Sequence, residues 1–152
     1  MKHGAMASGT STRLWLAIVI VVTFGTAAAA VGIDVRATYG AQLTADEPQY
    51  LLTAISIAED RNVDIRDELA AERYRPFHEV ELPQQTKPLS DGRRISPHDP
   101  LLPALLAAPM AIGGWVAAKA FLAALAGVLA GVILWAAVRR FSAPLLSATL
   151  AV

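Results

Sequence analysis

The sequence predicts an all-α fold: a multi-pass helical membrane protein with a partly helical extracytoplasmic loop. Hydrophobic residues make up 55% of the chain. Charged residues make up 17%, against roughly 25% in soluble globular chains. All 13 acidic residues lie between Asp34 and Asp99, and a long apolar stretch precedes and follows that region. A soluble domain would place carboxylates on every exposed face, so we predict two lipid-facing regions joined by one charged loop over 34–100.

The first transmembrane helix is predicted over residues 14–33, after a short basic cytoplasmic N-terminus over 1–13. These 20 uncharged residues would cover about 30 Å as a helix, the hydrocarbon thickness of a bilayer. A cleaved signal peptide is the alternative, because Lys2 and Arg13 would form its basic region and the alanines over 27–30 offer a cleavage site. We favour the uncleaved helix, since a second apolar region follows the loop.

The second apolar region begins at Leu101, and Lys119 alone interrupts it. Prolines and glycines weaken its first part as a regular helix, so we predict a broken interfacial or re-entrant segment over 101–114 and a second transmembrane helix over 115–138. Reading the region as two spans would leave the basic pair after it outside, against the positive-inside rule. The prolines and glycines are Pro103, Pro109, Gly113 and Gly114, and the basic pair is Arg139 and Arg140.

This arrangement predicts a protein of the plasma (cytoplasmic) membrane with its N-terminus inside. Residues 139–152 would form a cytoplasmic turn and the start of a third span, so we expect the chain to be the N-terminal part of a longer protein. In the second span, small residues recur every four positions, which favours close helix packing, although an alanine-rich helix can show this spacing by chance. These residues are Ala123, Gly127 and Gly131.

Within the loop, two juxtamembrane helices are predicted near 46–60 and 64–74. Adjacent acids, Asp46 and Glu47, stand where the first of these helices begins. A carboxylate there could act as a general base or hold a divalent cation, the one cofactor that the sequence suggests. Alternatively, Asp46 caps the helix and Glu47 interacts with the helix dipole.

The other end of the loop holds the second candidate, His98-Asp99, between two prolines. Histidine can carry a proton or contact a phosphate, and aspartate can orient it; the alternative is a solvated turn. Lys119 could meet a phosphate at the outer leaflet or only extend toward the interface. The chain has no cysteine, which excludes disulfides and thiol catalysis, and its zero net charge gives no case for nucleic acid.

The order of these features resembles the N-terminal part of GT-C-type membrane glycosyltransferases, the group that includes protein O-mannosyltransferases and aminoarabinose-type lipid A transferases. The resemblance lies in the first span, the motif over 45–51 (ADEPQYL), the motif over 96–103 (SPHDPLLP), and the following span with Gly113-Gly114 and Lys119. Several relatives have a lysine before the Pro-Leu that precedes the second span, whereas this chain has His98-Asp99.

By this resemblance, Asp46 would be the catalytic carboxylate that activates the acceptor, with Glu47 beside it. His98, Asp99 and Lys119 would then be the candidates for substrate binding. The donor would be a polyprenyl-phosphate sugar in the membrane lipid. The acceptor would attack this sugar with inversion of its configuration. The alternative function is a non-enzymatic multi-pass membrane protein whose charge-balanced loop binds a partner.

Overall fold

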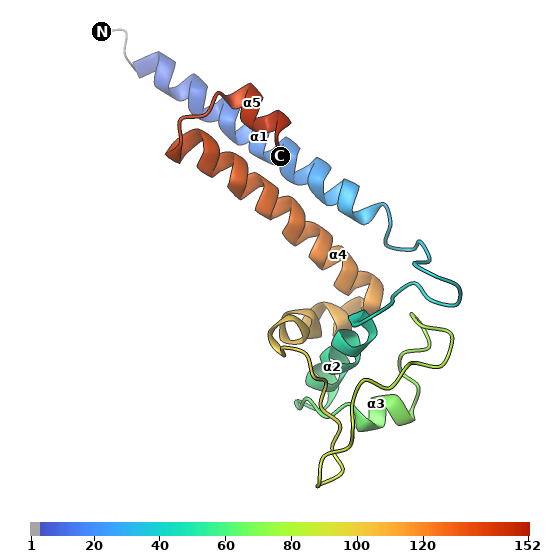
Figure 1. Cartoon of the computed structure of the whole chain (residues 1–152). Helices are drawn as coiled ribbons and strands as arrows, with labels where there is room; N and C mark the ends of the chain where they lie inside the picture. Colours follow the sequence, from blue (N-terminus) through green and yellow to red (C-terminus); the bar gives the residue numbers. More distant parts are fainter. Residues whose placement is uncertain (1–3) are drawn as a thin grey trace. The chain divides into compact units, whose positions relative to one another are not determined.

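The computed structural model describes the backbone of residues 4–152 and the side chains from Ser11 onward, so the predicted cytoplasmic residue Lys2 lies outside the described residues. The described chain is mostly helical and contains isolated β-bridges but no strand, which confirms the all-α prediction (Figure 1). Its helices are α1 (Gly4–Ala30), α2 (Glu47–Glu59), α3 (Arg66–Ala70), α4 (Leu101–Arg140) and α5 (Leu145–Leu150). The chain divides into two compact units, one of residues up to 31 together with 122–152, and one of residues 32–121.

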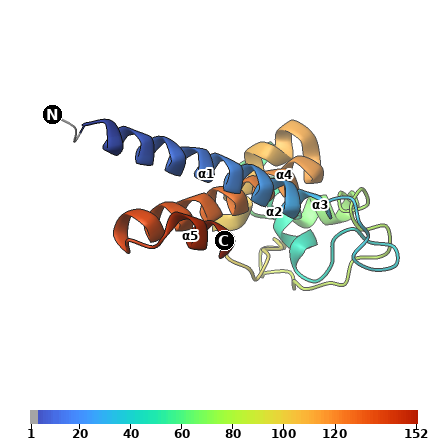
Figure 2. The ribbon, with the colours of Figure 1, turned by 90° about the horizontal axis from the view of Figure 1, so that it is seen from above.

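In the first unit, α1 runs antiparallel to the last part of α4 (Figures 1 and 2). Glycines allow the close approach: a Cβ on Gly127 would lie 2.6 Å from the carbonyl oxygen of Val22, and a Cβ on Gly131 would lie 2.6 Å from the Val22 side chain. Both spacings are shorter than real Cβ contacts. The repeat of small residues therefore marks a helix contact, as expected where backbones pack without bulky side chains between them.

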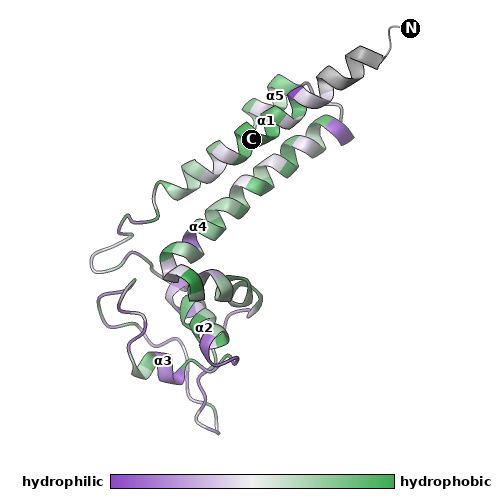
Figure 3. Ribbon diagram, turned by 180° about the vertical axis from the view of Figure 1, so that it is seen from behind, coloured by the Kyte–Doolittle hydropathy of each residue, from purple (hydrophilic) through white to green (hydrophobic). Residues whose placement is uncertain are grey.

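Two helices, α1 and α4, are long and apolar enough to cross a membrane. Large apolar side chains of the first unit are open to the surroundings, for example Phe24, 73% exposed, and Leu129, 60% exposed. Figure 3 shows hydrophobic residues along both helices and hydrophilic residues gathered in the chain between them. The short helix α5 follows Pro144 and packs against α1, where Ala148 is buried.

The second unit has a hydrophobic core of its own. Leu43, Leu52, Ile65 and Phe77 are almost completely buried, and each buried side chain of this size contributes about 1.5–3 kcal/mol. Backbone hydrogen bonds hold distant segments of the loop around this core. The amide of Leu43 donates to the carbonyl of Phe77 at 3.3 Å, and the amide of Ile65 donates to the carbonyl of Arg94 at 2.8 Å. The charged loop is therefore a folded unit.

Several element boundaries differ from those expected from the sequence. Helix α1 ends at Ala30, three residues before the predicted end, just ahead of Gly32. The second loop helix covers only 66–70 of the predicted 64–74, because Glu72 adopts a left-handed φ of 50° and the amide of Arg73 bonds back to the carbonyl of Glu68 at 2.9 Å. Such a left-handed residue ends a helix and satisfies its last carbonyls.

Helix α4 is interrupted at Gly113-Gly114, where the backbone leaves helical geometry. Gly114 has φ 66° and ψ −158°, a combination that is essentially restricted to glycine. The helical path changes direction at this point (Figure 1). Pro109, in contrast, lies within the helical part before the break. The break therefore separates the first helical part of α4 from the part that begins with Trp115 and carries Lys119.

Candidate functional site

Asp46 stands immediately before α2, preceded by a strained residue. Ala45 has φ 54°, a left-handed conformation that is uncommon for alanine. Asp46 occupies the N-cap position, yet its side chain makes no capping hydrogen bond. Instead, its Oδ1 atom accepts a hydrogen bond from Gln85 Nε2 at 3.3 Å and lies 3.6 Å from His98 Nε2. The carboxylate thus faces other side chains of the loop, and helix capping does not account for it.

Gln85 connects Asp46 to His98. Its Nε2 atom donates to Asp46 Oδ1 and to the carbonyl of Ala45, each at 3.3 Å, and its Oε1 atom lies 3.0 Å from His98 Nε2. Because an amide oxygen only accepts, this bond requires the hydrogen of a neutral imidazole to be on Nε2. The His98 ring also lies against Tyr50 of α2, with 4.9 Å between ring centroids, so its orientation is fixed from two sides.

Glu47 pairs with Lys119. The Nζ atom of Lys119 donates to Glu47 Oε1 at 3.1 Å, across 72 residues of sequence. The Lys119 side chain is 25% exposed and that of Glu47 is 49% exposed. An ion pair this open to solvent contributes only about 0–1 kcal/mol, so an incoming anion can displace the carboxylate from the ammonium at little cost.

Asp99 lies at the start of α4. Its Oδ1 atom accepts a hydrogen bond from the amide of Leu101 at 2.8 Å, which ties the chain into the first turn of that helix. This bond is local, and its geometry is that of an aspartate at a helix start. The hydrogen-bond partner of the His98 ring is Gln85, with Asp46 close by, so an orienting role of Asp99 toward His98 stays a prediction.

We call the group of Asp46, Glu47, Gln85, His98 and Lys119 the carboxylate cluster. Four of its members were candidates from the sequence. The structure brings them into two contacts, Asp46 with His98 and Glu47 with Lys119, which are joined through the adjacent residues Asp46 and Glu47. Gln85 was missed, because nothing in its sequence neighbourhood distinguishes it from the adjacent Gln84. Both carboxylates are about half exposed and each lies beside a nitrogen-bearing side chain. The cluster could accept a proton from a bound solute and neutralise an anion beside it.

No protein-family model, curated protein or solved structure to which the chain was compared matches it. The glycosyltransferase resemblance therefore remains an expectation from its motifs.

Proposed function

We propose that this chain is the N-terminal part of a GT-C-type integral membrane glycosyltransferase, which moves a sugar from a polyprenyl-phosphate donor to an extracytoplasmic acceptor at the carboxylate cluster. The observation that carries this proposal is the Asp46 side chain. It leaves the N-cap position uncapped and faces His98 and Gln85. A carboxylate held in this way serves a role other than helix stability, and proton transfer is the chemistry for which it is suited.

In the proposed reaction, Asp46 accepts the proton of an acceptor hydroxyl as its oxygen attacks the anomeric carbon of the donor sugar. The new carbon–oxygen bond forms on the face opposite the phosphate. The bond between the anomeric carbon and the phosphate oxygen breaks, and its electron pair leaves with polyprenyl phosphate. The configuration at the anomeric carbon is thereby inverted. Gln85 would hold the Asp46 carboxylate in position through its 3.3 Å hydrogen bond.

The leaving phosphate needs positive charge or hydrogen-bond donors, and we assign this role to Lys119 and His98. Lys119 would exchange Glu47 for the phosphate. This exchange costs little free energy, because the ion pair between Lys119 and Glu47 is partly exposed. His98 can donate from Nε2, the atom that now lies 3.0 Å from Gln85 Oε1. Because further negative charge develops on the phosphate as the bond breaks, removal of either side chain should lower kcat at least as much as it raises the KM for the donor.

The membrane arrangement forms part of the same proposal: a multi-pass protein of the plasma membrane with its N-terminus inside. The antiparallel contact between α1 and the end of α4 brings Arg13 to the same end of the first unit as Arg139 and Arg140. Cationic residues with no acid among them favour the cytoplasmic side. The acidic loop would then lie outside, where polyprenyl-linked sugars of this class are used.

The test is Asp46→Asn, which keeps the shape of the side chain and removes its basicity. We expect release of polyprenyl phosphate from a panel of polyprenyl-phosphate hexoses and pentoses to fall by about 10²–10⁴ in membranes with equal amounts of the longer protein that contains this chain, the usual effect of losing a general base. Asp34→Asn is the matched control, since Asp34 is exposed and lies outside the cluster. Full activity of Asp46→Asn would refute the assignment.

The second candidate function is a non-enzymatic membrane protein whose loop binds a partner. The observation in its favour is the separate core of the second unit, which would support a binding domain without any chemistry. The two functions differ in one measurement. If loop-dependent cross-linking captures the same partner from wild type and from Asp46→Asn, and no donor in the panel is consumed by either, partner binding replaces catalysis.

A further inference from the structure

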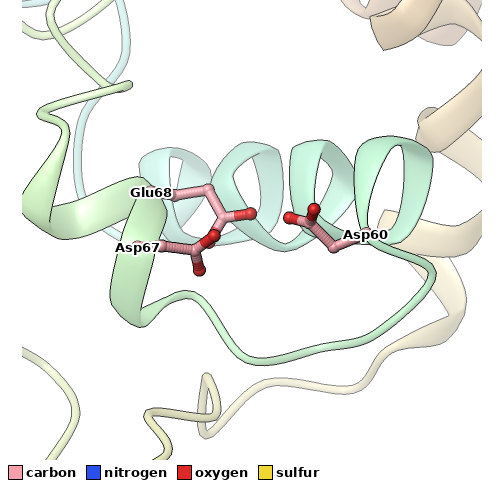
Figure 4. Close-up of side chains that lie close together, drawn as sticks. All are labelled: Asp60, Asp67 and Glu68. Carbon is pink, nitrogen blue, oxygen red and sulfur yellow. The ribbon is translucent and has the colours of Figure 1, made fainter.

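A second group of acids lies where the end of α2 meets α3. Asp60 is the C-cap residue of α2, and Asp67 and Glu68 belong to α3. One carboxylate oxygen from each of the three side chains lies within 4.8 Å of the other two. Figure 4 shows the carboxylates of Asp60 and Glu68 pointing toward each other, with that of Asp67 beside them. None of these residues belongs to the carboxylate cluster.

Glu68 distinguishes this group from an ordinary acidic surface. Its side chain belongs to a residue that is 3% exposed, and its Oε2 atom is buried without a hydrogen-bond partner among the described residues. A buried carboxylate oxygen without a partner is costly, and such atoms are rare in folded proteins. Burial raises the pKa of Glu68 to about 8, and the neighbouring Asp67 and Asp60 add to the rise.

Arg73 is a cation whose charge acts on Asp60 and Glu68, and it is already engaged elsewhere. Its guanidinium makes two hydrogen bonds to the carboxylate of Glu59, at 2.9 Å and 2.6 Å. Arg73 faces the carboxylates of Glu59, Asp60 and Glu68, so it does not by itself balance the acids around it. The buried oxygen of Glu68 is left without a partner that a small positive ion could supply.

We infer that Asp60, Asp67 and Glu68 bind a divalent cation, and that the cation is Ca²⁺. Three carboxylate oxygens are the hard ligands that Ca²⁺ prefers, and water can complete the coordination on the side of the exposed Asp60 and Asp67. Oxygens that lie within 4.8 Å of one another fit inside the coordination sphere of Ca²⁺, whose opposite ligands are roughly 4.6–5.2 Å apart. The flexible coordination of Ca²⁺ also suits carboxylates from two helices better than the near-ideal octahedron that Mg²⁺ demands. The bound ion would join α2 to α3.

The competing arrangement is a proton shared among the three carboxylates, which would relieve their repulsion without any metal. The two arrangements predict different responses to calcium. A metal site gives heat on calcium titration and a rise in the unfolding temperature of the loop. A shared proton gives neither at neutral pH, and neutralising Glu68 would then leave the response to calcium unchanged.

The experiment is calorimetric titration of the full chain in detergent with CaCl₂, after removal of divalent ions with EDTA. We expect one site with Kd of about 1 mM or tighter, in the range of extracellular calcium modules, and weaker binding of MgCl₂. Unfolding temperature at increasing CaCl₂ gives a second readout, because an ion that binds only the folded state stabilises it. Absence of both signals up to 10-fold above this Kd, about 10 mM, would overturn the inference.

Glu68→Gln tests the site itself and should weaken calcium binding at least about tenfold while the loop stays folded, since it removes one ligand charge but keeps the shape. Glu81→Gln is the matched control, an identical change at an exposed carboxylate of the same loop outside the group. Equal affinities in the two variants would refute the assignment. The site is independent of the proposed glycosyl transfer, so either result leaves the test on Asp46 unaffected.

Discussion

The two units of the chain place the same types of side chain in opposite surroundings. In the second unit, Leu52 is 0% exposed and Phe77 is 1% exposed. In the first unit, Leu129 is 60% exposed and Phe24 is 73% exposed. The second unit is stabilised by burial of apolar surface away from water, whereas the helices of the first unit present that surface outward. The difference is the one expected if water surrounds the second unit and an apolar phase surrounds the helices of the first unit.

Phenylalanine gives the largest expected contrast between the units. Phe77→Ala should destabilise the loop by about 3–5 kcal/mol, because it leaves a cavity in a core that cannot fully collapse. Phe24→Ala, the same change on an exposed face, should alter stability by less than about 0.5 kcal/mol. Urea unfolding of the purified protein in detergent measures both changes in stability, with cleavage of the loop by a protease as the signal of its unfolding. Equal effects would show that the second unit has no separate core.

Glycine tests the first unit, where contact depends on the absence of a side chain. A Cβ at Gly127 would lie 2.6 Å from the carbonyl oxygen of Val22 and 2.9 Å from the amide nitrogen of Thr26, and neither backbone atom can move freely. Gly127→Ala should therefore separate α1 from α4 and cost about 1–3 kcal/mol. Faster hydrogen exchange of the backbone amides in α1 would show that the two helices have separated. Gly32→Ala, where a Cβ would meet nothing within 4 Å, should leave exchange unchanged.

The smallest expected effect belongs to the surface of the second unit. Arg73 holds the pKa of Glu59 below its ordinary value, chiefly through their hydrogen bonds. A lowered acid pKa stabilises the fold above the ordinary pKa of about 4.5, and this contribution disappears as the pH falls through the lowered value. Glu59→Gln should cost about 0.2–1 kcal/mol at pH 7, since the pair is about half exposed, and the cost should shrink as the pH falls through the lowered pKa. A loss that does not change with pH would assign the effect to packing.

The sequence predicted those features that depend on local composition. The apolar stretches, the acidic loop, the start of α2 at Asp46-Glu47 and the weakness at Gly113-Gly114 all follow from residue type and spacing. The left-handed conformation of Glu72, which shortens α3, was not predictable, because glycine usually takes that position and glutamate rarely does. The unpartnered oxygen of Glu68 was also invisible, since burial depends on tertiary packing.

The candidate site was predicted as separate residues, but its connections required the structure. Glu47 and Lys119 are 72 residues apart, and Asp46 and Gln85 are 39 apart, so no spacing rule relates them. Asp99 illustrates the opposite case. Its place beside His98 indicated a shared role, whereas its carboxylate bonds to the amide two residues later. Adjacency in sequence does not by itself place two side chains in contact, because consecutive residues at a helix start point in different directions.

The break at Gly114 makes the short segment that follows it intolerant of changes in length. Lys119 reaches Glu47 from a fixed number of helical positions beyond the break. One residue inserted between these two points would turn Lys119 by about 100° around the helix axis and carry the ammonium away from its carboxylate partner. The exposed turn over 90–93 does not set the position of Lys119 relative to Glu47. An insertion among residues 115–118 should therefore separate Lys119 from Glu47, whereas an insertion at that turn should leave the pair in place.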